Sequence, residues 1–131
     1  MAEDNLAIVK AIYSDWERGD FTSTDWAHPE ISYKVPGPEH EVSGIEGMSR
    51  AWGGWMEAYK GLTVSAVSMQ TVGDAIVVEQ AFQGEGRASG IPIDEIPSAA
   101  SFMFRDGRVI RFHGYSSLEE AFADPKLAGG D

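Results

Sequence analysis

Apolar residues in the first sixty positions recur at spacings of three and four, the period of a helix that buries one face. Within residues 5–18 the residues that show this period are Leu6, Val9, Tyr13 and Trp16. Gly19 follows at the place of a helix C-cap. A second helix is predicted over residues 43–60, because Ser43 and Glu46 have the spacing of a capping box and the same period continues after them.

The pattern between and after these helices is different. Residues 22–27 predict a short helical turn, ended by His28-Pro29, and residues 31–35 alternate like a short strand. After Gly61 the period changes to two. This alternation predicts strands over residues 62–71, 75–85, 97–105 and 108–116, with tight turns at Gly73-Asp74 and Asp106-Gly107. A last short helix is predicted over 118–123, before a loose tail over 124–131.

This order of elements predicts an α+β fold. We expect one domain, residues 1–131, with a core of about 5–123 and an antiparallel meander that is strongly curved. The helices should pack on its concave face, which makes a cone-shaped roll and leaves room for a small-molecule pocket.

Composition narrows the function classes. The formal net charge is −11, which disfavours nucleic acid and anionic membrane surfaces as partners. The chain has no cysteine, so thiolate metal sites and cysteine nucleophiles are excluded. The acidic N-terminus resembles no secretory signal, and no apolar stretch has the length of a membrane helix. We therefore expect a cytoplasmic protein, and no pattern in the sequence indicates a cofactor or a metal.

If the strands alternate as predicted, every second residue faces the helices. The inward strand positions are then Ile31, Tyr33, Val35, Val78, Gln80, Phe82, Ser98, Ala100, Phe102, Phe112 and Gly114. From the helices, the facing residues are Tyr13, Trp16, Met48, Trp52, Trp55 and Met56. Any one of these aromatic residues could be ordinary core. Together, with four tryptophans in 131 residues, they favour a partly open aromatic pocket.

Four local strings occur in an order and spacing that resemble a known group of proteins. They are residues 13–20 (YSDWERGD), 43–47 (SGIEG), 86–90 (GRASG) and 102–109 (FMFRDGRV). With the order of elements, they make the chain similar to the nuclear transport factor 2-like superfamily, in particular its SnoaL-like branch. The resemblance implies the cone fold, frequent homodimers and a small-molecule pocket. It does not imply one activity, because this fold carries isomerases, cyclases, hydrolases and non-catalytic carriers.

The resemblance also allows the known chemistries to be tested position by position. The acid positions of ketosteroid isomerases fall at Val35 and Ala100, and their tyrosine falls at Ile12, one residue before Tyr13. The catalytic Arg and Asp of limonene-epoxide hydrolases fall at Gln80 and Phe82. The acid on the last strand, shared with the SnoaL-type cyclases, falls at Gly114. None of these residues exchanges a proton near neutral pH, so we expect neither isomerase nor epoxide hydrolase activity by those mechanisms.

Four residues remain as polar candidates for catalysis: Tyr13, Tyr33, His40 and Gln80. The phenols and the amide need partners when buried, and the partner could be a ligand oxygen or another of these groups. His40 lies between two glutamates and could act as an acid or base, although an exposed loop histidine is the commoner case. The sequence thus predicts a pocket for a small hydrophobic, cyclic molecule, which an isomerase, cyclase or hydratase could use. The alternatives are a non-catalytic carrier or sensor, and a dimerisation module whose pocket is vestigial.

Overall fold

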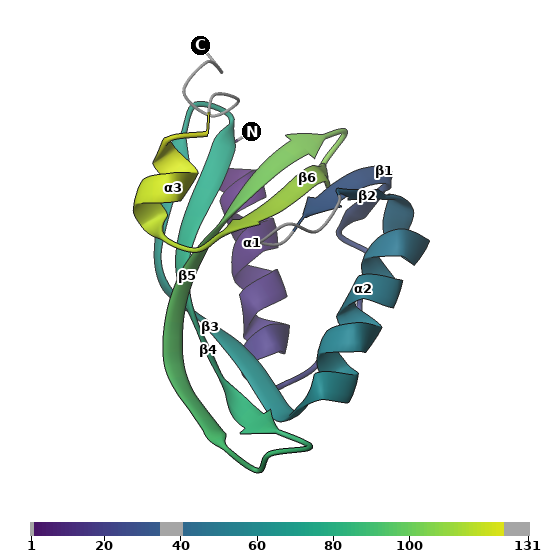
Figure 1. The fold of residues 1–131 in the computed structure, drawn as a ribbon. Coiled ribbons are helices and arrows are strands. Elements are labelled where there is room, and N and C mark those ends of the chain that lie inside the picture. Colours follow the sequence, from purple (N-terminus) through teal and green to yellow (C-terminus); the bar gives the residue numbers. More distant parts are fainter. Residues whose placement is uncertain (1, 35–40, 125–131) are drawn as a thin grey trace.

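The computed structural model describes residues 2–34 and 41–124, and every side chain in these ranges except those of residues 2, 3, 55, 56 and 93–96. It has three helices and six strands within these ranges (Figure 1). In chain order they are α1 (Ala2–Glu17), β1 (Ala27–Lys34), β2 (Val42–Ser43), α2 (Gly44–Ala58), β3 (Tyr59–Val72), β4 (Ala75–Gly86), β5 (Pro92–Arg105), β6 (Arg108–Tyr115) and α3 (Leu118–Phe122). The predicted α+β class is confirmed.

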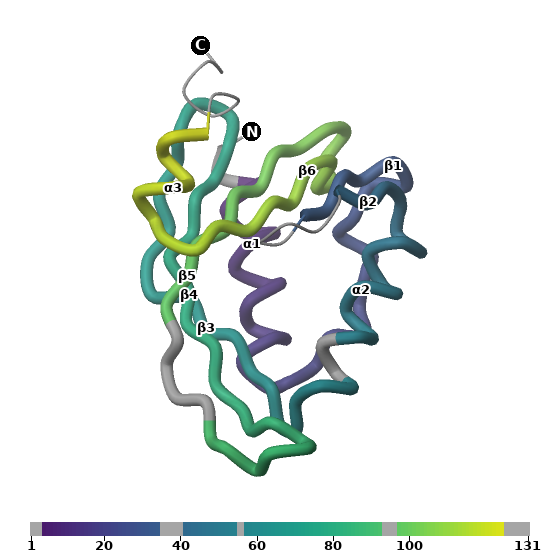
Figure 2. Tube along the Cα trace, viewed as in Figure 1, coloured from purple at the N-terminus to yellow at the C-terminus, as the bar shows by residue number. Residues whose placement is uncertain are grey.

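The strands form one sheet in the order β2-β1-β6-β5-β4-β3. The last four strands are the antiparallel meander that the alternation predicted. Their tight turns place Gly73, Asp106 and Gly107 at positive φ, where glycine and aspartate cost least. The long strands bend, and α1 and α2 lie on the concave side, as in the nuclear transport factor 2-like cone (Figures 1 and 2).

The end of α1 is set by local chemistry, as the sequence predicted. Gly19 has φ +78°, the left-handed conformation of a Schellman C-cap. The Gly19 amide donates to the Trp16 carbonyl at 2.9 Å, and the Asp20 amide donates to Asp15 at 3.0 Å. The cap ends α1 at Glu17, so Trp16 lies in the last turn of the helix, where its ring stacks on Phe112 of β6.

The segment between the two helices differs from the prediction. Residues 22–27 form no helix but contain a single hydrogen-bonded turn, in which the Ala27 amide donates to the Thr24 carbonyl at 3.0 Å, and β1 begins at Ala27 and runs through His28-Pro29. The register between β1 and β6 shifts between Ala27 and Ser32. Pro29 lies in this irregular part of the strand. Proline has no amide hydrogen, and at this position no regular ladder hydrogen bond needs one.

Two further details of the predicted sheet are corrected. β1 pairs with β6 in parallel, so the sheet is mixed rather than wholly antiparallel. These strands are far apart in the sequence, and no hairpin fixes their relative direction. The expectation of helices on one face is also incomplete, since α3 packs on the outer face, where its Ala121 forms a cluster with Ala75, Val77 and Ala99.

Gly84 lies at an irregular point of β4, where β3 approaches closely. The register with β5 shifts between Phe82 and Gly84. A Cβ on Gly84 would lie 3.2 Å from the Leu62 Cα and 3.3 Å from the Lys60 carbonyl oxygen. The close approach of the β3 backbone at this point favours a glycine, and β4 continues past it to Gly86.

The main core lies between the concave face of the sheet and helices α1 and α2. Alternation along β4 separates the two faces, since Ile76 and Val78 belong to this core, whereas Ala75 and Val77 belong to the cluster under α3. In the part of the chain that the structure describes, no helix combines the length and the hydrophobicity needed to cross a bilayer.

Candidate functional site

Seven aromatic rings in the main core, which we call the aromatic cluster, pack in edge-to-face, stacked or tilted pairs. They are Tyr13, Trp16, Trp26, Tyr33, Trp52, Phe102 and Phe112. Trp16 lies at the centre, with ring centroids 5.0 Å from Tyr13, 5.6 Å from Phe112 and 5.8 Å from Trp52. These separations are typical of favourable aromatic pairs. The cluster therefore gives the concave side a continuous aromatic lining.

Sheet register places three of these rings side by side. Tyr33 of β1 pairs with Phe112 of β6, and Phe112 pairs with Phe102 of β5. Phe102 and Phe112 are stacked, with centroids 4.8 Å apart and an interplanar angle of 11°. Directly paired residues project to the same face of a sheet, so the row follows from alternation and register alone.

One polar chain crosses this apolar interior. The Tyr13 hydroxyl donates to Gln80 Oε1, and Gln80 Nε2 donates to Ser98 Oγ at 3.1 Å. Gln80 and Ser98 are paired residues of β4 and β5, and Tyr13 reaches them from α1. All three groups are neutral, so the chain can form hydrogen bonds without bringing a charge into the core.

Burial keeps both candidate phenols protonated. It raises the pKa of Tyr13 well above its ordinary value. It also raises the pKa of Tyr33 to about 12, although a hydrogen bond from Trp52 acts in the opposite direction. Neither phenol is ionised at neutral pH, so each can orient a ligand but is a poor general base.

The structure brings most of the predicted site residues together. Those buried in the main core are Tyr13, Trp16, Tyr33, Met48, Trp52, Gln80, Ala100, Phe102 and Phe112. Phe82 and Gly114 are half-buried on the inner face, and Gly114 lies opposite Ala100. Val35 and His40 lie outside the described residues. Trp55 and Met56 belong to α2, but their side chains lie outside the description.

Sequence reasoning left Trp26 out of the site and treated Ser98 only as an inward strand position. Trp26 contacts Trp16, Trp52 and Phe112, and its indole nitrogen donates to the Ser23 carbonyl at 3.0 Å. It precedes β1 in a segment without periodicity, so only its size could have identified it. The signal for Ser98 was its pairing with Gln80 across two predicted strands.

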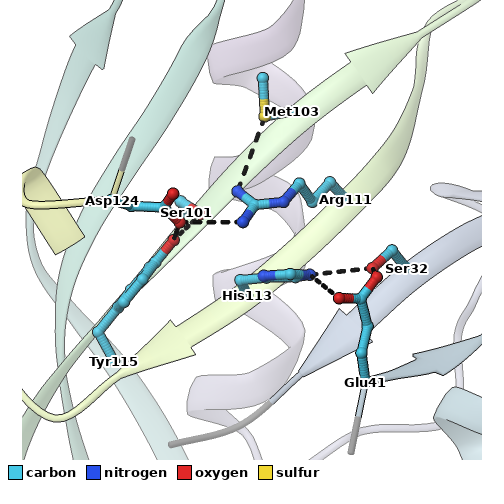
Figure 3. Close-up of polar contacts among 8 residues, drawn as sticks. All are labelled: Ser32, Glu41, Ser101, Met103, Arg111, His113, Tyr115 and Asp124. Carbon is cyan, nitrogen blue, oxygen red and sulfur yellow. Dashed lines mark hydrogen bonds and ion pairs between the residues drawn. The ribbon is translucent and has the colours of Figure 1, made fainter. Parts of the chain in front are cut away.

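Polar side chains on the outer face of the sheet form a separate group (Figure 3). His113 points away from the aromatic cluster, because it lies between the inward residues Phe112 and Gly114 of β6, and its Nε2 lies 2.9 Å from Ser32 Oγ and 3.9 Å from a Glu41 oxygen. The carboxylate therefore faces the same ring nitrogen as the serine. A Ser-His-acid triad needs the acid on the opposite nitrogen, Nδ1, so this group is not arranged as a hydrolytic triad.

A second part of this outer group holds the end of the described chain. Arg111 is paired with Asp124 at 2.9 Å, and Tyr115 also donates to Asp124 (Figure 3). Ser101 lies 3.0 Å from the Tyr115 hydroxyl. These contacts attach the residues after α3 to β5 and β6, which gives them a structural role. Among the described residues, no three side chains of the metal-ligating types converge on one point.

A hollow of about 260 Å³ lies elsewhere, at the two tight turns of the meander. Its lining includes Asp74, Arg105 and Asp106 beside Asn5 of α1. The charges of opposite sign partly cancel, and none of these side chains belongs to the aromatic cluster. We assign no function to this hollow.

His113 should make the protein less stable in mild acid. Burial, and after it the positive charge of Arg111, lower the pKa of His113 from 6.5 to about 4, although Glu41 opposes the shift. Between these pH values the unfolded chain binds a proton that the folded chain does not. The free energy of unfolding should therefore fall by about 1–3 kcal/mol as the pH drops from 6.5 to 4.

Urea denaturation at several pH values measures this, with His113→Gln as the comparison. The glutamine variant should lack this part of the pH dependence, whereas His28→Gln should keep it. Equal pH dependence in the wild-type protein and His113→Gln would contradict the assignment.

Comparison with known families agrees with this geometry. The sequence profile of the SnoaL-like domain family matches residues 9–112. This chain therefore belongs to the SnoaL-like domain family, which confirms the resemblance to the SnoaL-like branch of the nuclear transport factor 2-like superfamily. No curated protein matches the chain.

Solved structures with similar folds cover almost the whole chain. A candidate SnoaL-like polyketide cyclase from Jannaschia sp. CCS1 is 20% identical over 93% of this chain and 91% of its own, with a TM-score of 0.73. A protein with a ketosteroid isomerase-like fold from Catenulispora acidiphila DSM 44928, in complex with trimethylamine, is 18% identical over 92% of each chain, with a TM-score of 0.70. TerC, co-crystallised with polyporic acid, is 18% identical over 96% of this chain and 98% of its own, with a TM-score of 0.74. At these identities the likeness establishes the fold.

Proposed function

We propose that this protein binds a neutral, cyclic, mainly apolar small molecule between α1, α2 and the concave face of the sheet. The observation that carries the proposal is the aromatic cluster, crossed by the neutral chain from Tyr13 through Gln80 to Ser98. Aromatic surface binds apolar rings without needing a charge, and a few neutral polar groups fix their orientation. The two structures of this fold with trimethylamine and with polyporic acid support a small molecule as the ligand.

The same interior favours a carrier or sensor over an acid-base enzyme. Of the described residues that are buried, the polar ones other than tyrosine are Gln80, Ser98, Ser101 and His113, and the last two lie on the outer face. Phe82, Ala100 and Gly114 occupy the acid positions of the related enzymes. An isomerase, cyclase or hydratase activity would then depend on His40, the one candidate that exchanges a proton near neutral pH.

Binding can be tested by titrating the tryptophan fluorescence with a panel of steroids, terpenes and aromatic polyketides. Trp16, Trp26 and Trp52 all belong to the aromatic cluster, so a ligand that enters it should change the emission. We expect at least one neutral cyclic class to give a saturable change at micromolar concentrations, and charged analogues of the same ring system to give none. A panel without any saturable response would favour the dimerisation module with a vestigial pocket.

We also propose a homodimer formed through the outer face of the sheet. α3 covers the part of this face around Ala75, Val77 and Ala99, but it is only five residues long. A six-stranded sheet offers more surface than so short a helix covers. Light scattering at high micromolar concentration should give twice the 14.2 kDa mass of the chain, and a monomer mass there would refute the dimer.

A further inference from the structure

The series of hydrogen bonds that links Tyr13, Gln80 and Ser98 becomes more accessible toward its Ser98 end. Tyr13 is 1% exposed, Gln80 6% and Ser98 7%. Ser98 shares the inner face of β5 with Ala100 and Phe102, so its side chain projects toward the concave side. Tyr13 is the closed end of the chain, and Gln80 with Ser98 is the end that a molecule in the interior could touch.

In this series of hydrogen bonds, two of the polar hydrogens have no acceptor. The Tyr13 hydroxyl has one hydrogen, the Gln80 amide has two and the Ser98 hydroxyl has one. The two hydrogen bonds use two of these four hydrogens, and reversing the amide does not change the count. In the orientation that the structure shows, the unused hydrogens are on Gln80 Nε2 and Ser98 Oγ. Neither has another partner among the described residues.

These two donors are placed to converge on one atom. Gln80 Nε2 and Ser98 Oγ are 3.1 Å apart, so a single oxygen can lie within hydrogen-bond distance of both. A buried donor without an acceptor is costly, whereas a spare lone pair costs less. The pair should therefore prefer a ligand oxygen with two lone pairs and no hydrogen of its own, which describes a ketone or quinone carbonyl.

We infer that Gln80 and Ser98 form a carbonyl-binding pair that selects neutral cyclic ketones or quinones among the ligands of the aromatic cluster. This inference rests on the proposed function and adds the chemical class of the ligand. Ser98 then determines specificity, while Tyr13 is a positioning residue that holds the Gln80 amide from the closed side. A carboxylate ligand is disfavoured, because no cationic side chain accompanies the two donors among the described residues of the inner face.

The test compares two probes that differ in the carbonyl, 1-tetralone and tetralin, in titrations of tryptophan fluorescence. Ser98→Ala should weaken the binding of 1-tetralone roughly threefold to tenfold and leave that of tetralin within about twofold. The matched control is Ser101→Ala, a buried serine of the same strand on the opposite face, which should change neither affinity. Thermal melts confirm that both variants fold.

A second readout is the infrared carbonyl stretch of bound 1-tetralone. It should lie at lower frequency in the wild-type protein and in Ser101→Ala than in Ser98→Ala, because two hydrogen bonds weaken the carbonyl bond. Unchanged 1-tetralone affinity and frequency in Ser98→Ala would overturn the carbonyl-binding pair while leaving the proposed function intact. Failure of both probes to bind the wild-type protein would overturn the proposed function, and this inference with it.

Discussion

Replacing Trp16 by alanine should lower the free energy of unfolding by about 3–5 kcal/mol. Trp16 packs against five other rings of the core, so its loss leaves a large cavity that no single neighbour can fill. A domain of this size is stable by only about 5–15 kcal/mol, so the loss is a large fraction of the total.

Urea denaturation measures the change, with Val67→Ala as the control. Val67 is 63% exposed on the edge strand β3, and its truncation should change the free energy by no more than about 0.5 kcal/mol. A Trp16→Ala variant as stable as Val67→Ala would show that the aromatic cluster is not tightly packed.

Replacing Trp52 by alanine should weaken ligand binding by about 1–3 kcal/mol, which is roughly fivefold to more than a hundredfold in the dissociation constant. Trp52 lies where α2 meets the sheet, with ring contacts to Trp16, Trp26 and Tyr33. It would contribute aromatic surface to a ligand and also a hydrogen bond to Tyr33. The measurement is the fluorescence titration with the best ligand of the panel.

Phe104→Ala is the matched control for Trp52→Ala. Phe104 packs against the same core, and it also lines the hollow at the tight turns, which we do not assign to the ligand. The control should lower stability without weakening binding by more than about twofold. Equal losses of affinity in the two variants would mean that affinity only follows stability.

The parts of the fold that depend on local pattern could be predicted from the sequence. The alternation after Gly61 correctly identified the four long strands and the faces of Val78, Gln80 and Ala100. The cap at Gly19 and the helix start at Ser117, whose hydroxyl accepts from the Glu120 amide, follow from the same local chemistry.

The parts of the fold that depend on pairing between distant segments could not be predicted from the sequence. The parallel contact of β1 with β6 joins strands that are about eighty residues apart, and nothing local specifies its direction. Trp26 enters the aromatic cluster only because β1 is placed beside β6. The hydrogen bond between Tyr13 and Gln80 joins a helix to a strand in the same way, so sequence reasoning found both residues but left their partners open.

The measurement that tests the central claim most directly is a crystal structure of the protein grown with the best ligand of the panel. The account predicts ligand density on the concave side of the sheet, in contact with Trp52 and within hydrogen-bond distance of Ser98 Oγ. An interior in which the protein's own side chains fill this space, with the ligand absent or bound on the outer face, would contradict it.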